Sequence, residues 1–221
     1  MNRLNILHLA SYLGGGTARY LEDLTHHNTA HNHFVLSIGT QDDVLFAKAQ
    51  KRYYPLTLKA DQQWQAEALQ TLMQAVRPDI IHIHLFTASV LTAVDKMRQA
   101  WPIPYLVTLH DLNFYYADAF KRTDFTQLEP QDRAWQQRSA LVLAAAEAVI
   151  VPSVYIQNYA SQLVAESALH LIPHGIEYHP PHLSAATQQL ASQLWQQSGY
   201  EASRPTIAIV GAIGPHKGRR T

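Results

Sequence analysis

The stretch LNILHLASYLGGGTARYLEDLT, residues 4–25, decides the fold class of this chain. A short apolar run, Leu4–Ala10, passes through a glycine cluster into Thr17–Thr25, where apolar residues recur at helical spacing. A strand, a glycine turn and a helix in this order are typical of a parallel sheet whose strands are joined by helical crossovers. The opening segment therefore predicts an α/β domain.

The same alternation of apolar strands and amphipathic helices continues to about Pro181. The other expected strands are Phe34–Ile38, Ile80–His84, Tyr105–Leu109, Val149–Val151 and Leu169–Ile172. The other expected helices are Trp64–Val76, Thr87–Ala100, Pro130–Ala146 and a helix capped by Ser153 that runs to about Val164. Connections of this length allow crossovers, so we expect a Rossmann-like doubly wound parallel sheet over residues 1–181.

Residues 182–221 are expected to form a linker and the incomplete start of a second domain. A polar helix is predicted over Ser184–Gln197, and Pro205–Gly211 is one more strand candidate. A parallel strand needs a partner from a later crossover, and the sequence ends at Thr221 before one appears. We therefore expect the second domain to be truncated.

The composition excludes several classes of protein. Lys+Arg and Asp+Glu are 17 each, which argues against a nucleic-acid binder. The chain has no cysteine, so disulfides and thiolate metal sites are excluded, and a reducing compartment suits it. The start resembles no signal peptide, and no run of 18 apolar residues occurs. We expect a cytoplasmic protein with, at most, peripheral membrane contact.

Four groups of residues are candidates for chemistry, and the first is the glycine loop Gly14-Gly15-Gly16-Thr17. Glycines let the backbone approach a ligand, and a helix amino terminus offers N–H groups to an anion such as a diphosphate. The dinucleotide fingerprint G-x-G-x-x-G is absent. The alternative is a glycine turn that serves only to reverse the chain.

The second group is His82-Ile83-His84, whose alternating side chains place both imidazoles on one side of the sheet. A metal pair is conceivable, but no carboxylate is placed to complete it. We expect no metal there, and interpret His82 as a core residue and His84 as facing a cleft.

The third group is His110-Asp111, at the end of a predicted strand and followed by Tyr115 and Tyr116. A histidine and an acid in such a loop can position a hydroxyl group or share a proton. The alternative is a loop in which Asp111 accepts backbone N–H bonds and His110 is simply packed. The aromatic pair favours a platform for a sugar or a lipid.

The fourth group is the glycine turn Gly211–Gly218, where Lys217 would place a positive charge near an anionic ligand. It is not a Walker loop, because Gly218 stands where that motif needs a hydroxyl residue. The alternative is a solvated basic end. His26, His27, His31 and His33 fall in a predicted polar loop and receive no role.

Six segments, in order, resemble the motifs of glycosyltransferase family 4. They are Gly15-Gly16-Thr17-Ala18-Arg19-Tyr20, Pro78-Asp79-Ile80-Ile81-His82-Ile83-His84, Thr108-Leu109-His110-Asp111, Val151-Pro152-Ser153, Ile172-Pro173-His174-Gly175-Ile176-Glu177 and Gly211–Gly218. The resemblance spans essentially the whole chain. His174 stands where the family has asparagine, Glu177 where it has aspartate, and Ala212 where it often has an arginine that helps to hold the donor diphosphate.

The resemblance implies half of a GT-B fold and metal-free, retaining transfer of a hexose-type sugar from a nucleotide diphosphate sugar to a glycan or lipid-linked acceptor. His110 would orient the donor sugar as the catalytic residue. The residues implied for donor binding are Gly15, Gly16, His216 and Lys217, and those for acceptor binding are Arg19, His84, Asp111, Tyr115 and Tyr116. No cofactor is implied. Acceptors of this kind allow contact with the inner face of the membrane.

Two rival interpretations stay open. A nucleotide-dependent epimerase or dehydrogenase would need G-x-G-x-x-G and a ribose-binding acid, and neither is present. A non-catalytic module that binds a glycan or a protein partner is compatible with Ala212. Because the family's Glu-x7-Glu donor motif is absent from these 221 residues, we expect them to fold but to be inactive on their own.

Overall fold

The computed structural model describes residues 3–10, 15–38, 43–47, 52–56, 59–60, 63–64, 66–122, 124–175, 184–197 and 199. The chain divides into two compact units, Met1–Gly175 and Ile176–Thr221. The expected boundary at Pro181 falls outside the described residues. The described part of the second unit contains the helix α6, Ala185–Gln197, close to the predicted Ser184–Gln197. The strand and glycine turn expected over residues 205–218 also lie outside the described residues.

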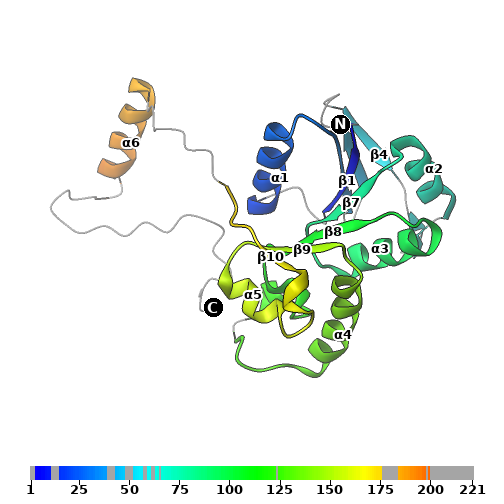
Figure 1. Cartoon of the computed structure of the whole chain (residues 1–221). Helices are drawn as coiled ribbons and strands as arrows, with labels where there is room; N and C mark the ends of the chain where they lie inside the picture. The colour runs from blue at the N-terminus through cyan, green and yellow to red at the C-terminus, as the bar shows by residue number, and fades with distance from the viewer. Residues whose placement is uncertain are drawn as a thin grey trace. The chain divides into compact units, whose positions relative to one another are not determined.

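The first unit is built on one eight-stranded sheet in the order β10-β9-β8-β7-β1-β2-β3-β4 (Figure 1). Six of these strands are parallel: β1 (Asn5–Ala10), β2 (Asn32–Ile38), β7 (Ile80–Ile83), β8 (Tyr105–Thr108), β9 (Ala148–Val151) and β10 (Leu169–Leu171). Each coincides with an expected strand to within a few residues. The Rossmann-like α/β fold is therefore confirmed.

The remaining strands were not predicted. β3 (Asp43–Ala47) and β4 (Arg52–Leu56) form an antiparallel extension beside β2, and β5 (Lys59–Ala60) and β6 (Gln63–Trp64) form a separate two-stranded sheet. Pro55 lies within β4, and proline argues against a central strand. The proline is tolerated in β4 because β4 is the edge strand of the sheet and, in the part of the chain that the structure describes, pairs only with β3.

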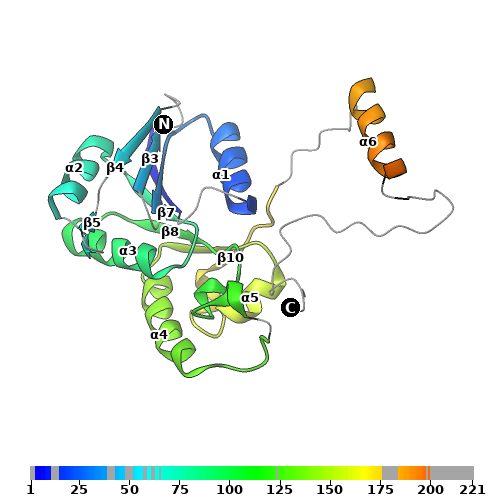
Figure 2. The ribbon, with the colours of Figure 1, turned by 180° about the vertical axis from the view of Figure 1, so that it is seen from behind.

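Five helices cover the sheet: α1 (Gly15–His27), α2 (Ala66–Val76), α3 (Ala88–Ala100), α4 (Pro130–Ala144) and α5 (Val154–Ala160). Figures 1 and 2 show α1 on one side of β1 and β7, with α2 and α3 on the other. Local signals fix several helix starts, because Thr87 and Ser153 each accept a hydrogen bond from a backbone N–H three residues on.

The order of the strands reverses at β1. α1 leads from β1 to β2 on one side, and the chain then returns to place β7 on the other side of β1. In open α/β sheets, ligands bind beyond the carboxyl ends of the strands at such a switch point. None of the described helices is both long and apolar enough to cross a membrane.

Candidate functional site

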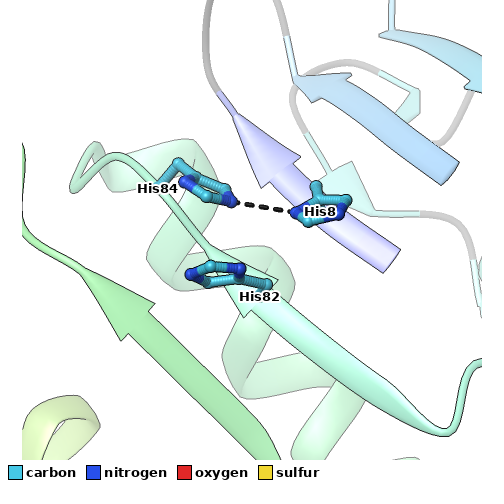
Figure 3. Close-up of side chains that lie close together, drawn as sticks. All are labelled: His8, His82 and His84. Carbon is cyan, nitrogen blue, oxygen red and sulfur yellow. Dashed lines mark hydrogen bonds between the residues drawn. The ribbon is translucent and has the colours of Figure 1, made fainter. Parts of the chain in front are cut away.

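Histidine side chains gather around β1, from the amino-terminal part of β2 to the carboxyl ends of the neighbouring parallel strands. They come from five strands or from the residues that follow them: His8, His33, His82, His84, His110 and His174. His8 and His82 are register partners on β1 and β7, so both imidazoles project from the same face of the sheet. Figure 3 shows His8, His82 and His84 converging at the switch point.

Five of these imidazoles form one hydrogen-bonded series, which we call the histidine chain: His33, His8, His84, His110 and His174. His33 Nδ1 lies 3.0 Å from His8 Nε2, and His8 Nδ1 lies 3.0 Å from His84 Nε2. His84 Nδ1 lies 3.2 Å from His110 Nε2, and His110 Nδ1 lies 3.1 Å from His174 Nε2. Every step thus joins two ring nitrogens directly.

The inner end of the histidine chain fixes two tautomers. His33 Nε2 lies 2.7 Å from the Asn28 carbonyl oxygen, which can only accept, so His33 carries its proton on Nε2. The Nδ1 of a neutral His33 is then an acceptor, and His8 must donate to it from Nε2. A neutral His8 is left with an unprotonated Nδ1 that faces His84.

Burial lowers the pKa of five imidazoles of the cluster and so favours their uncharged form at neutral pH: His8, His82, His84, His110 and His174. Loss of hydration lowers the pKa of His8 and of His84 well below the usual value, and neighbouring histidines lower both further. The same two causes lower the pKa of His82 to about 4 and that of His110 to about 3. Burial also lowers the pKa of His174. A neutral imidazole offers one lone pair, so the group is a set of acceptors and potential ligands.

The first helix packs against the outer part of the histidine chain through Tyr20. The Tyr20 ring centroid lies 4.4 Å from that of His174, 4.8 Å from that of His110 and 5.8 Å from that of His84. Gly15 and Gly16 begin the same helix, so its amino-terminal turn is at the strand ends that carry His110. A Cβ atom added to Gly16 would meet no atom within 4 Å, which leaves the backbone there open to a ligand.

Comparison with known proteins agrees with the sequence motifs. A sequence model of Glycosyltransferase Family 4 matches residues 14–179, three quarters of the chain. The chain belongs to Glycosyltransferase Family 4. No curated protein matches the sequence. Among solved structures, UDP-N-acetylglucosamine 2-epimerase from Rickettsia bellii is similar, with a TM-score of 0.47 and 10% identity. The similarity covers 90% of this chain and 52% of the epimerase, so the chain spans about half that protein's length.

The structure brings together several of the residues that the Glycosyltransferase Family 4 motifs predict for the site. His84 and His110 are hydrogen-bonded to each other, and α1, which begins at Gly15, contacts both through Tyr20. His84 is fully buried, rather than facing a cleft as expected. Asp111 accepts a hydrogen bond from the Asn113 backbone N–H at 2.8 Å and caps a short 3-10 helix, Leu112–Phe114. The alternative interpretation, in which Asp111 accepts a backbone N–H bond within its loop, therefore describes its hydrogen bonding.

Three of the predicted acceptor residues have other partners. Arg19 lies on the exposed surface of α1, where its guanidinium group pairs with Glu22 and Asp23. Tyr115 and Tyr116 are 7% and 2% exposed, so their rings offer no open platform for a sugar. Their hydroxyl groups donate to Gln162 and to the Phe125 carbonyl oxygen, at 2.6 Å each. These tyrosines hold the loop after β8 in place, and any part they play in acceptor binding is indirect.

Sequence reasoning missed several members of the cluster. His33 lies in β2 and is 4% exposed, not in a polar loop, because strand pairing with β1 carries it into the sheet. The available signals were a histidine between Leu7 and Leu9 in a buried strand, for His8, and a histidine three residues after the end of a strand, for His174. His216 and Lys217, predicted to bind the donor, lie outside the described residues.

Proposed function

We propose that the chain is the acceptor-side part of a retaining glycosyltransferase that transfers a hexose-type sugar from a nucleotide diphosphate sugar to a glycan or lipid-linked acceptor. The observation that carries this proposal is the family match over residues 14–179. The position of the site supports it, because the glycine turn and His110 lie at the carboxyl ends of parallel strands beside the switch point.

In the proposed reaction the amino terminus of α1 faces the donor diphosphate. The first N–H groups of a helix have no partner within the helix, and they can stabilise the charge that develops on a departing diphosphate. Gly15 and Gly16 suit this role because they place no side chain between those N–H groups and the ligand. Lys217 and His216 are proposed to neutralise the donor diphosphate as well, and the step itself would need no metal.

His110 is proposed to orient the donor sugar by a hydrogen bond. In this structure its Nε2 is bonded to His84 and its Nδ1 to His174. Contact with a sugar hydroxyl therefore requires His174 to give up its bond to Nδ1. His174 follows β10 and is partly exposed, so it is the member of the histidine chain best placed to move aside.

Acceptor contacts are proposed for Arg19 and Asp111, with His84, Tyr115 and Tyr116 acting from beneath the surface. Arg19 can leave its exposed pairing with Glu22 and Asp23 at little cost, since exposed ion pairs contribute under about 1 kcal/mol. A lipid-linked acceptor would place the protein at the inner face of the membrane, on its cytoplasmic side.

One observation favours a second candidate, a non-catalytic module that binds a glycan or a protein partner. Both ring nitrogens of His110 are already used within the protein. A domain that no longer orients a donor sugar could keep both nitrogens of His110 bonded to His84 and His174. This candidate predicts glycan or partner binding with no response to nucleotide sugars.

Thermal unfolding with a panel of UDP-, GDP- and ADP-sugars distinguishes the two candidates. The transferase proposal expects one donor to raise the Tm of the chain, and expects the rise to be reduced in a Gly16→Ala variant. Release of nucleoside diphosphate measures turnover, which we expect to be absent for these 221 residues alone. If no nucleotide sugar shifts the Tm while a glycan does, the binding module is supported. If neither does, the transferase proposal fails, and the binding module is left only with a protein partner.

A further inference from the structure

His8, His82 and His84 converge beside the switch point, and the proposed transfer reaction assigns no role to His8 or His82 (Figure 3). Each contributes one ring nitrogen to a group whose members all lie within 4.8 Å of one another. The three side chains are 1%, 6% and 0% exposed. They come from two adjacent strands, since His8 is on β1 while His82 is on β7 and His84 directly follows it.

The other ring nitrogen of each imidazole forms a hydrogen bond to a residue outside this group of three. His8 Nε2 is bonded to His33 Nδ1 at 3.0 Å, and His84 Nδ1 to His110 Nε2 at 3.2 Å. His82 Nε2 lies 2.8 Å from Thr108 Oγ1. Histidines that ligate a metal nearly always use their second nitrogen in this way, because the outer bond fixes the tautomer and the orientation of the ring.

All three outer nitrogens can donate at the same time. His8 donates to His33, as the Asn28 carbonyl requires. His84 Nδ1 can donate to His110 Nε2, whose own Nδ1 can donate to His174, and His82 can donate to Thr108. In that arrangement the lone pairs of His8 Nδ1, His84 Nε2 and His82 Nδ1 are all bare. His8 Nδ1 and His84 Nε2 are 3.0 Å apart. Two lone pairs repel each other at this distance unless a proton or a cation lies between them.

We propose that His8, His82 and His84 form a binding site for one divalent transition-metal ion of the zinc type. Imidazole nitrogens select zinc, cobalt, nickel or copper over magnesium and calcium, which prefer oxygen. A tetrahedral ion bound at about 2.0–2.1 Å places pairs of ligand nitrogens roughly 3.3 Å apart. The nitrogens of His8 and His84, 3.0 Å apart, are already near that spacing. The His82 nitrogen would reach the same spacing from the other two by a movement on the order of 1 Å.

The sequence alone suggested no metal at His82 and His84, and His8 is the third ligand that changes this expectation. Two histidines without a carboxylate do not make a metal site, but register pairing of β1 with β7 supplies His8 from the neighbouring strand. Three protein ligands leave one tetrahedral position for water. The ion would join the two strands at the switch point, and it lies beyond the proposed transfer reaction, which does not use it.

Metal binding can be tested on the chain as it is, after treatment with a chelator and dialysis. Titration with Co2+ is expected to give one equivalent of bound ion with the intense visible absorption of tetrahedral coordination, and Zn2+ is expected to displace it. Zn2+ should also raise the Tm. A weak octahedral spectrum, or no saturable binding by the wild-type chain, would overturn the proposal.

Variants then assign the ligands. His84→Gln and His8→Gln are expected to abolish tetrahedral Co2+ binding, whereas Thr108→Val, which removes the partner of His82, should weaken it by about 10- to 100-fold. His26→Gln is the matched control, because His26 is an exposed histidine on α1 outside the group. Loss of binding in the control with retention in His84→Gln would refute the assignment. The Thr108→Val variant and the wild-type titration decide the question if a ligand variant does not fold. No nucleotide sugar is involved, so this result is independent of the proposed function.

Discussion

Replacement of Asp132 by asparagine is expected to destabilise the protein by about 3 kcal/mol. Asp132 is fully buried at the start of α4. One carboxylate oxygen accepts from Arg122 at 2.5 Å and from the Glu129 backbone N–H at 2.7 Å, and the other accepts from the Ala117 backbone N–H at 3.0 Å. The asparagine side chain would turn an amide donor toward Arg122 or toward a backbone N–H, and it would leave a guanidinium group that is 7% exposed without its main counter-charge.

The size of the effect follows from the partners that remain. Breaking one partner of a buried ion pair costs about 3–5 kcal/mol. We place this variant at the lower end, since Glu129 stays 3.5 Å from Arg122 and can take up part of the charge. For a chain of about 150–250 residues, each kcal/mol lowers the Tm by about 2–4 °C, so the expected fall is about 6–12 °C.

Urea unfolding followed by circular dichroism measures the loss, and Asp118→Asn is the matched control. Asp118 pairs with Lys121 in the same loop, but the two side chains are 65% and 81% exposed. The same chemical change there should cost under about 1 kcal/mol. If Asp132→Asn cost no more than Asp118→Asn, the reasoning from burial would be refuted.

Three smaller changes test other parts of the structure. Gly16→Ala should raise the free energy of unfolding by about 0.4–1 kcal/mol, because the added Cβ meets no atom within 4 Å and the unfolded chain loses conformational freedom. A loss of stability on urea unfolding would contradict this. Ser153→Ala should cost about 1 kcal/mol on urea unfolding, since the Ser153 hydroxyl caps α5 through the Ile156 N–H, while Ser153→Asn should retain most of the stability. Tyr105→Phe should cost about 0.5–1.5 kcal/mol by the loss of the hydrogen bond to the Val142 carbonyl oxygen, and an unchanged Tm would show that this bond contributes nothing.

The parallel half of the fold could be predicted from the sequence because its signals are local. Buried strands such as Val149–Val151 are continuous apolar runs, and helices such as Ala66–Val76 show regular spacing and end before a proline. The antiparallel extension could not be predicted. The strands at residues 43–47 and 52–56 are short runs separated in the sequence by Lys48-Ala49-Gln50-Lys51, and their pairing depends on the neighbouring edge of β2 rather than on any pattern of their own.

The candidate site could be predicted only where the motif and the strand end coincide. His84, His110 and the glycine turn were found in this way. His8 and His33 were missed because they are single polar residues in buried strands, and only the register of β1 with β2 and β7 reveals that they meet. Tyr115 and Tyr116 were interpreted as a sugar platform because a sequence does not show which side of a loop packs inward.

The position of Pro55 also bears on whether a second copy of the chain could add a strand to this sheet. β4 is the outermost strand on one side of the sheet, and a proline there lacks the N–H that an added strand would need at that residue. The opposite margin is formed by β10, which is only three residues long. Within the described residues, neither edge strand offers a long, regular row of donors and acceptors, so this part of the sheet is a poor template for pairing with a second copy.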